Sequence, residues 1–147
     1  MATTAKPDPI SVVPALGPER PVVWPKPAHR RLANGLEIVM LESHNIPKFT
    51  GQLYFRSGNS AAPQAPGLAG ITAEVARTAT AHRASRQIEE DLRRIGADMG
   101  TGAGTDTSYI SFAGLTDFSG ELLKLVAELA QEALFPIEEF ERERRQL

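Results

Sequence analysis

Apolar residues recur with two different periods along this sequence, and the order of those periods constrains the fold. Phe49, Leu53 and Phe55 lie at alternating positions, which is typical of a β-strand. Between residues 122 and 133 apolar residues recur every three or four positions, which is the cleanest amphipathic helix pattern in the chain. Strands and helices of one chain bury their apolar sides against each other, so both kinds of element must share one core.

The patterns predict elements in the order strand–strand–helix–helix–strand–strand–helix–helix. The predicted strands are residues 36–41, 49–55, 98–104 and 107–114, and the predicted helices are residues 67–79, 85–95, 119–133 and 137–147. Asn34-Gly35 predicts a tight turn before the first strand, and Ser85 is expected to cap the second helix. This order favours an α+β fold, in which helices pack on one face of a mostly antiparallel sheet.

Residues 1–28 differ from the rest of the chain because they hold most of its 11 prolines. Proline removes a backbone donor and interrupts helices, so this segment is predicted to be an extended arm or linker. Two alternatives stay open: a disordered leader, or an arm that packs on a neighbouring domain through Val22, Val23 and Trp24. Residues 29–147 are predicted to be the N-terminal part of an α+β domain, and we expect the natural protein to continue beyond Leu147.

Composition excludes several classes of function. The net charge is -2 and the basic residues are spread along the chain, which argues against nucleic-acid binding. The absence of cysteine excludes disulfides, thiolate metal sites and a cysteine nucleophile. No apolar run reaches the roughly 18 residues that a membrane span needs, and no signal peptide follows Met1. His29, His44 and His82 are too isolated to nominate a metal site, and we expect them on the surface.

The segment Gly100-Thr101-Gly102-Ala103-Gly104 is rich in glycine but lies in a predicted strand. A nucleotide-binding loop would have to lead into a helix, so we do not expect nucleotide binding. Glycine inside a strand marks a close approach by another backbone, and a strand of small residues can accept an added peptide strand. Met99, Gly100, Thr101 and Gly102 are therefore candidate peptide-binding residues, with a plain edge or bulge as the alternative.

The segment from Pro66 to Val75 resembles the start of the zinc-binding helix of the insulinase/pitrilysin metallopeptidases, Gly-Leu-Ala-His-x-x-Glu-His. Gly70 and Glu74 occupy the two histidine positions of this inverted zinc motif, and Ala73 occupies the glutamate position. Imidazoles bind Zn²⁺ and a carboxylate activates the bound water, and glycine and alanine can do neither. The motif is therefore degenerate.

Four further segments resemble the same family in the same order, so the similarity extends over residues 30–147. They are residues 32–39, residues 55–59, residues 96–97 with 107–109, and residues 134–144. The resemblance implies an insulinase- or mitochondrial processing peptidase-like α+β fold. Two departures go with it: the family's third zinc ligand would fall beyond Leu147, and Met99 and Gly100 replace the Asn-Ala pair of its substrate-binding strand.

The resemblance further implies a non-catalytic bacterial subunit that pairs with an active zinc peptidase and helps to enclose a peptide substrate. Zinc is then expected in the partner and no cofactor in this chain, and a periplasmic or secreted location is expected. Two alternatives remain open. One is an active zinc metalloendopeptidase in which His82 or His44 replaces a missing ligand, and the other is a purely structural subunit of a larger complex.

Overall fold

The computed structural model describes residues 17–19 and 21–146. The chain divides into two compact units, and the boundary in the sequence lies between Ser43 and His44. Prolines 7, 9 and 14 of the predicted arm lie outside the described residues. From residue 21 to residue 27 the chain has no regular secondary structure, and Val22, Val23 and Trp24 are exposed. The proposed division into an arm and a domain at residue 28 stays a prediction.

The first unit contains a β-hairpin of β1 (Ala28–Arg31) and β2 (Glu37–Met40), paired antiparallel with Arg30 opposite Ile38. The turn lies where Asn34-Gly35 predicts it: Gly35 has a φ of 89°, and the Leu36 amide donates to Asn34 Oδ1 at 3.1 Å. The sequence patterns do not predict β1, because its residues are small or charged and show no apolar alternation. The segment forms a strand because its backbone pairs with β2.

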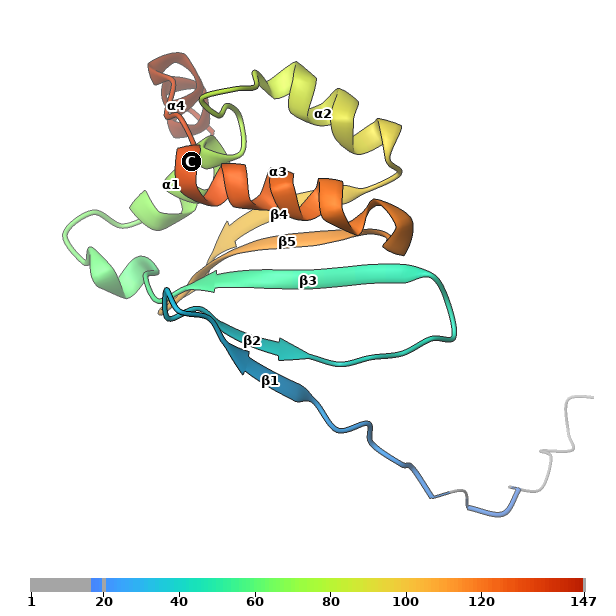
Figure 1. The fold of residues 1–147 in the computed structure, drawn as a ribbon. Coiled ribbons are helices and arrows are strands. Elements are labelled where there is room, and N and C mark those ends of the chain that lie inside the picture. The colour runs from blue at the N-terminus through green and yellow to red at the C-terminus, as the bar shows by residue number, and fades with distance from the viewer. Residues whose placement is uncertain (1–16, 20, 147) are drawn as a thin grey trace, which may run out of the picture. The chain divides into compact units, whose positions relative to one another are not determined.

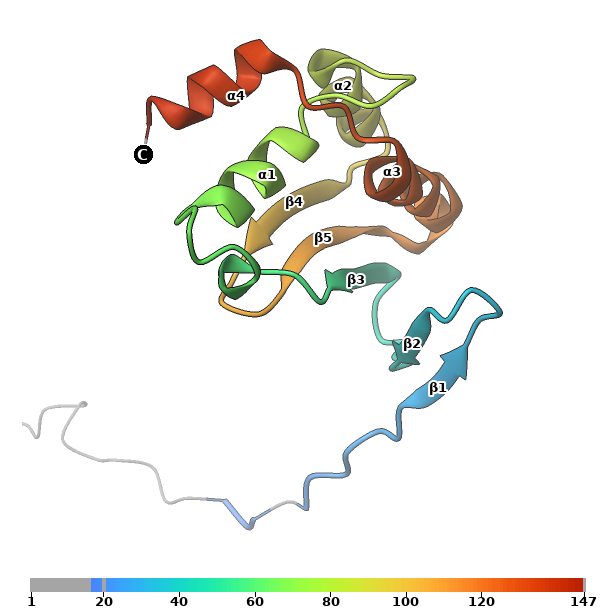
Figure 2. The ribbon, with the colours of Figure 1, turned by 90° about the vertical axis from the view of Figure 1, so that its left-hand side faces the viewer.

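The second unit is built on a three-stranded antiparallel sheet in the order β3-β5-β4. Its strands are β3 (Lys48–Phe55), β4 (Asp98–Ala103) and β5 (Ser108–Leu115). Its helices are α1 (Leu68–Ala76), α2 (Ser85–Arg94), α3 (Ser119–Glu132) and α4 (Ile137–Arg144). Figures 1 and 2 show α1, α2 and α3 on the same side of this sheet, which confirms the expected α+β architecture.

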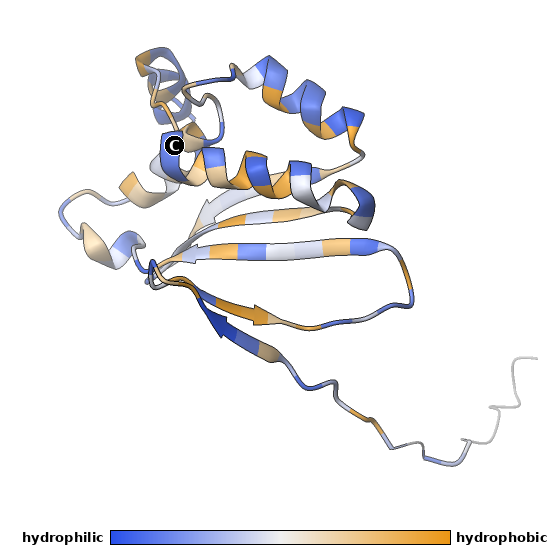
Figure 3. Ribbon diagram, viewed as in Figure 1, coloured by the Kyte–Doolittle hydropathy of each residue, from blue (hydrophilic) through white to orange (hydrophobic). Residues whose placement is uncertain are grey.

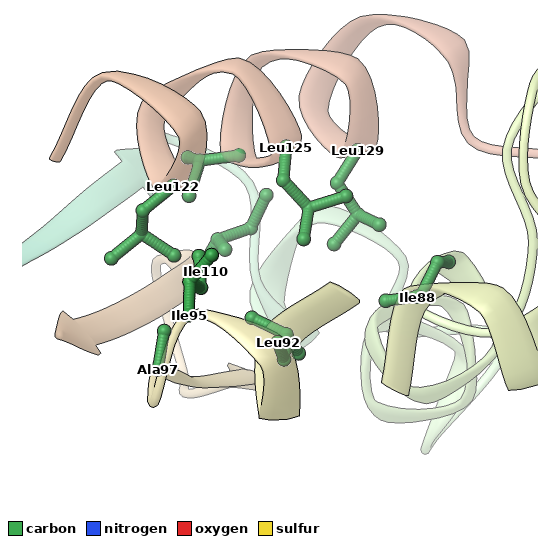
Figure 4. Close-up of a cluster of buried hydrophobic side chains, with 9 residues drawn as sticks. Ile88, Leu92, Ile95, Ala97, Ile110, Leu122, Leu125 and Leu129 are labelled. Atoms are coloured by element: carbon green, nitrogen blue, oxygen red, sulfur yellow. The ribbon is translucent and has the colours of Figure 1, made fainter. Parts of the chain in front are cut away.

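The core of this unit lies between the helices and the sheet. Figure 4 shows Leu122, Leu125 and Leu129 of α3 directed toward Ile110 of β5 and Leu92 of α2. Leu122 is 0% exposed, as expected for the strongest apolar stripe in the chain. Figure 3 shows α2 as mostly hydrophilic, and only its buried Ile88 and Leu92 anchor it to the core.

Helix boundaries differ from the predicted ones by a few residues. Gly67, with a φ of 85°, precedes α1, which ends three residues earlier than predicted. Ser85 is the first residue of α2 and makes no capping hydrogen bond, so the expectation that it caps this helix was wrong. The chain instead enters α2 from a tight bend in which Ala79 is bridged to Ala84, and this pairing places Ala84 at the cap position.

Candidate functional site

The three positions of the degenerate motif lie together on α1. Gly70 and Glu74 are four residues apart and therefore share one side of the helix. A Cβ atom added to Gly70 would meet no other atom within 4 Å, so the backbone there has room for a side chain. The Glu74 carboxylate is engaged by Arg77, whose Nε lies 3.1 Å from Oε2. The helix thus keeps the geometry of a ligand pair without the imidazoles.

Ala73 faces the interior and is 8% exposed. A carboxylate that activates water must reach both the water and the metal, and the methyl group of alanine offers only packing. The third position of the motif therefore stabilises the fold and supplies no acid–base group.

The histidines do not complete a metal site in the described part of the chain. His82 Nε2 lies 2.8 Å from Glu132 Oε2 at the end of α3, whereas His29 belongs to β1 in the other unit. Among residues 17–19 and 21–146, no three or more side chains of His, Cys, Asp or Glu are grouped so that they could hold a metal ion. His82 and Glu132 supply two potential ligands, fewer than zinc requires.

A polar network missed in the sequence surrounds Arg83, between α1 and α2. Arg83 Nε donates to Asp91 Oδ2 of α2 at 2.9 Å, and Arg83 also pairs with Glu128 of α3. Thr80 donates its hydroxyl to the same Glu128 and accepts the Arg83 backbone amide at 2.9 Å. These partners are up to 48 residues apart in the chain, so no local pattern indicates them. The network fixes the bend before α2 against both helices.

Met99, Gly100, Thr101 and Gly102 lie in β4, which has β5 as its one strand neighbour in the described sheet. The Gly104 amide donates to the Thr107 carbonyl at 2.8 Å, which marks a hydrogen-bonded pair. Such pairs alternate in an antiparallel ladder, so Gly102 and Gly100 also bond to β5. The backbone groups of Met99, Thr101 and Ala103 consequently point to the open edge of the sheet.

The glycines of β4 leave space for side chains of the neighbouring strand. A Cβ atom on Gly102 would lie 2.6 Å from Tyr109 Oη, and one on Gly100 would lie 3.2 Å from Ser111 Oγ. Side chains of the neighbouring strand β5, not another backbone, therefore occupy the space above these two glycines. These contacts were not expected, because cross-strand neighbours are set by the register, which the local sequence does not reveal. Peptide binding at this strand stays a prediction.

Thr101 lies on the opposite face of β4 from these glycines, toward the helices. Its neighbour across the ladder is Ile110, a core residue. Its Oγ1 is buried and has no hydrogen-bond partner among the described residues. Because a buried hydroxyl without a partner costs free energy, this position is a local weakness of the edge strand.

Neither a protein-family model nor a curated protein sequence matches this chain. Among solved structures, it is similar to a peptidase M16 inactive domain from Pseudomonas fluorescens, with a TM-score of 0.77 and 28% sequence identity over 82% of this chain. It is also similar to a protease from Helicobacter pylori, with a TM-score of 0.69 and 19% identity over 83% of this chain. The chain has a peptidase M16-like fold.

The M16-like chain spans 30% of the length of each of these two structures. The likeness confirms the expected peptidase-like α+β fold. The finer assignment to the insulinase/pitrilysin family rests on the sequence segments and stays a prediction. In the described residues, no helix is long and apolar enough to cross a membrane.

Proposed function

We propose that this chain is a non-catalytic M16-type subunit, which pairs with an active zinc peptidase and helps to enclose its peptide substrate. The observation that carries the proposal is which residues occupy the three motif positions on α1. Its two ligand positions lie on one side of the helix, but they hold Gly70 and an ion-paired Glu74, and the position of the general base holds the buried Ala73. The Pseudomonas fluorescens structure with the similar fold is itself described as an inactive domain.

These residues do not fit a zinc ion. Gly70 has no donor atom, and the Glu74 carboxylate is already paired with Arg77. A catalytic zinc site needs three protein ligands and an open position for water. No catalytic step is therefore assigned to this chain, and the zinc belongs to the proposed partner.

The role proposed for this chain is to hold the peptide in an extended form. The open edge of β4 presents the backbone amides and carbonyls of Met99, Thr101 and Ala103. An extended peptide can satisfy them as an added strand, a mode in which main-chain hydrogen bonds supply the affinity. Met99, Gly100, Thr101 and Gly102 would then contact the substrate without acting on it.

Affinity purification of the tagged native protein from its own cells, followed by mass spectrometry, tests the pairing. The expected result is a stoichiometric partner whose sequence contains His-x-x-Glu-His, with zinc-dependent peptidase activity in the complex and none in this chain alone. Zinc-dependent proteolysis by the purified chain alone would overturn the proposal. Recovery without such a partner would favour a purely structural subunit.

The same proposal includes a location outside the cytoplasm, in the periplasm or the medium. It is supported by the resemblance to bacterial members of this type and by the proline-rich N-terminal segment. Fractionation of the native cells, with immunodetection of the protein in each fraction, measures this directly. Recovery in the cytoplasmic fraction alone would contradict it.

A further inference from the structure

The sheet face that points away from the helices carries two tyrosines beside the open edge. The pairing register places Tyr54 of β3, Tyr109 of β5 and Gly102 of β4 side by side. Side chains alternate between the two faces of a sheet, and the neighbouring row of Leu53, Ile110 and Thr101 faces the core, so the tyrosine row faces outward. The two tyrosine rings are 6.2 Å apart.

Tyr109 extends across β4 toward the open edge. Its hydroxyl oxygen and Cζ would lie 2.6 and 2.7 Å from a Cβ atom on Gly102, so the end of the ring lies over that glycine. No side chain of β4 stands between Tyr109 and the edge at this level, because both Gly100 and Gly102 lack one. The phenol is therefore the outermost side-chain group of this row.

A peptide strand added to β4 would place every second side chain on this face. Adjacent strands lie roughly 4.8 Å apart, so the peptide backbone would run about 10 Å from the Tyr109 backbone, with the tyrosine ring filling much of that gap. A large side chain opposite Gly102 would meet the ring, whereas an alanine would not reach it. Within the paired strands, the charged residues of this face are Lys48 and Asp98, which lie toward the opposite end.

We propose that Tyr109 determines specificity, so that the β4 edge prefers peptides with an aromatic side chain opposite Gly102. The inference rests on the proposed function, since it requires that peptides pair with β4. Aromatic side chains suit this position because the ring of Tyr109 lies beside it, and aromatic pairs at strand spacing attract each other. Gly102 is required because any side chain there would displace the phenol.

The test compares two fluorescein-labelled nine-residue peptides, one of alternating threonine and phenylalanine and one of alternating threonine and alanine. Binding to the full chain is measured by fluorescence anisotropy, and amide shifts of Met99, Thr101 and Ala103 by NMR report the binding site. We expect the phenylalanine peptide to bind about two- to fivefold more tightly, the range for a cross-strand aromatic contact.

Two variants remove the contact in different ways. Tyr109→Ala deletes the ring, and Gly102→Ala keeps it but forces it away from the edge; both should lose the preference for the phenylalanine peptide. Tyr54→Ala is the matched control, because it removes the same kind of side chain one strand farther from the edge and should keep the preference. Circular dichroism verifies that each variant is folded.

The outcomes separate the two proposals. Amide shifts at β4 with equal affinity for both peptides, or a preference that persists in folded Tyr109→Ala and Gly102→Ala, would overturn the role of Tyr109 and leave peptide binding intact. If neither peptide shifts the β4 amides, the proposed peptide role of the edge is wrong, and the role of Tyr109 fails with it.

Discussion

At the scale of single residues, the positions on which the proposed function rests hold small residues. Gly70 and Ala73 provide neither an imidazole nor a carboxylate on α1, and the lack of a side chain at Gly102 leaves space for Tyr109. An M16-like fold is therefore compatible with an α1 that lacks the sequence His-x-x-Glu-His.

The interpretation of positions 70 and 74 as former zinc-ligand positions can be tested by placing histidines there. In the double variant Gly70→His, Glu74→His, both imidazoles lie on one side of the helix, and the space at Gly70 accepts the new side chain. We expect this variant to bind Zn²⁺ measurably in isothermal titration and still to lack peptidase activity, because Ala73 provides no base. The single variant Gly70→His is the control and should bind more weakly. Equal zinc binding by wild type would contradict this view of α1.

The unpartnered hydroxyl of Thr101 gives a second prediction. Thr101→Val keeps the shape of the side chain and removes the buried polar group, so the free energy of unfolding should rise by about 1 kcal/mol. Thr78→Val is the matched control: the Thr78 hydroxyl donates to the Val75 carbonyl at 2.7 Å, and its loss should lower stability by about 1 kcal/mol. Urea denaturation measures both, and a destabilised Thr101→Val would show that its hydroxyl has a partner.

At the scale of elements, the second unit depends on contacts between segments that are distant in sequence. The helix α2 is mostly hydrophilic and buries only Ile88 and Leu92, so polar contacts contribute to its position. Arg83 supplies them by joining Asp91 of α2 to Glu128 of α3. The side chains of Arg83 and Glu128 are 30% and 13% exposed, and shielding from water strengthens their ion pair.

Removal of this connection should be costly. Arg83→Ala leaves Glu128 partly buried without its cation, and we expect a loss of about 2 kcal/mol in the free energy of unfolding. Arg86→Ala breaks an ion pair with Glu90 that is largely exposed, and it should cost less than about 0.5 kcal/mol. Thermal and urea unfolding of the two variants give the comparison, and equal losses would exclude a special role for Arg83.

At the scale of the whole molecule, the two units are unequal in how they are stabilised. All described residues that are buried and apolar belong to the second unit, whereas every residue of β1 and β2 is exposed. A lone two-stranded hairpin is marginally stable in water, while a sheet covered by helices can fold by itself. The second unit is thus the more stable of the two.

This difference predicts that residues 44–147 fold without the preceding segment. The shortened chain should keep its helical circular dichroism signal and a cooperative thermal transition within about 5 °C of the midpoint of the full chain. A non-cooperative transition would show that residues before His44 complete the core. The reverse piece, residues 1–43, is the control and should show no cooperative transition.

The sequence by itself determined the α+β class, the strand β3, the helix α3 and the absence of His-x-x-Glu-His from residues 70–74. Each of these follows from local information: the spacing of apolar residues along one segment, or the identity of residues at the motif positions. Asn34-Gly35 likewise specifies its own turn, because the conformational preference lies in the two residues themselves.

Only the tertiary structure decided which segments meet. The strand β1 has no pattern of its own and depends on pairing with β2, and Arg83 finds Glu128 across 45 residues of chain. The register of β4 against β5 placed Tyr109 over Gly102 and turned Met99, Thr101 and Ala103 to the open edge. These contacts arise from packing between segments that are separate in the chain, and a one-residue shift in register would abolish them.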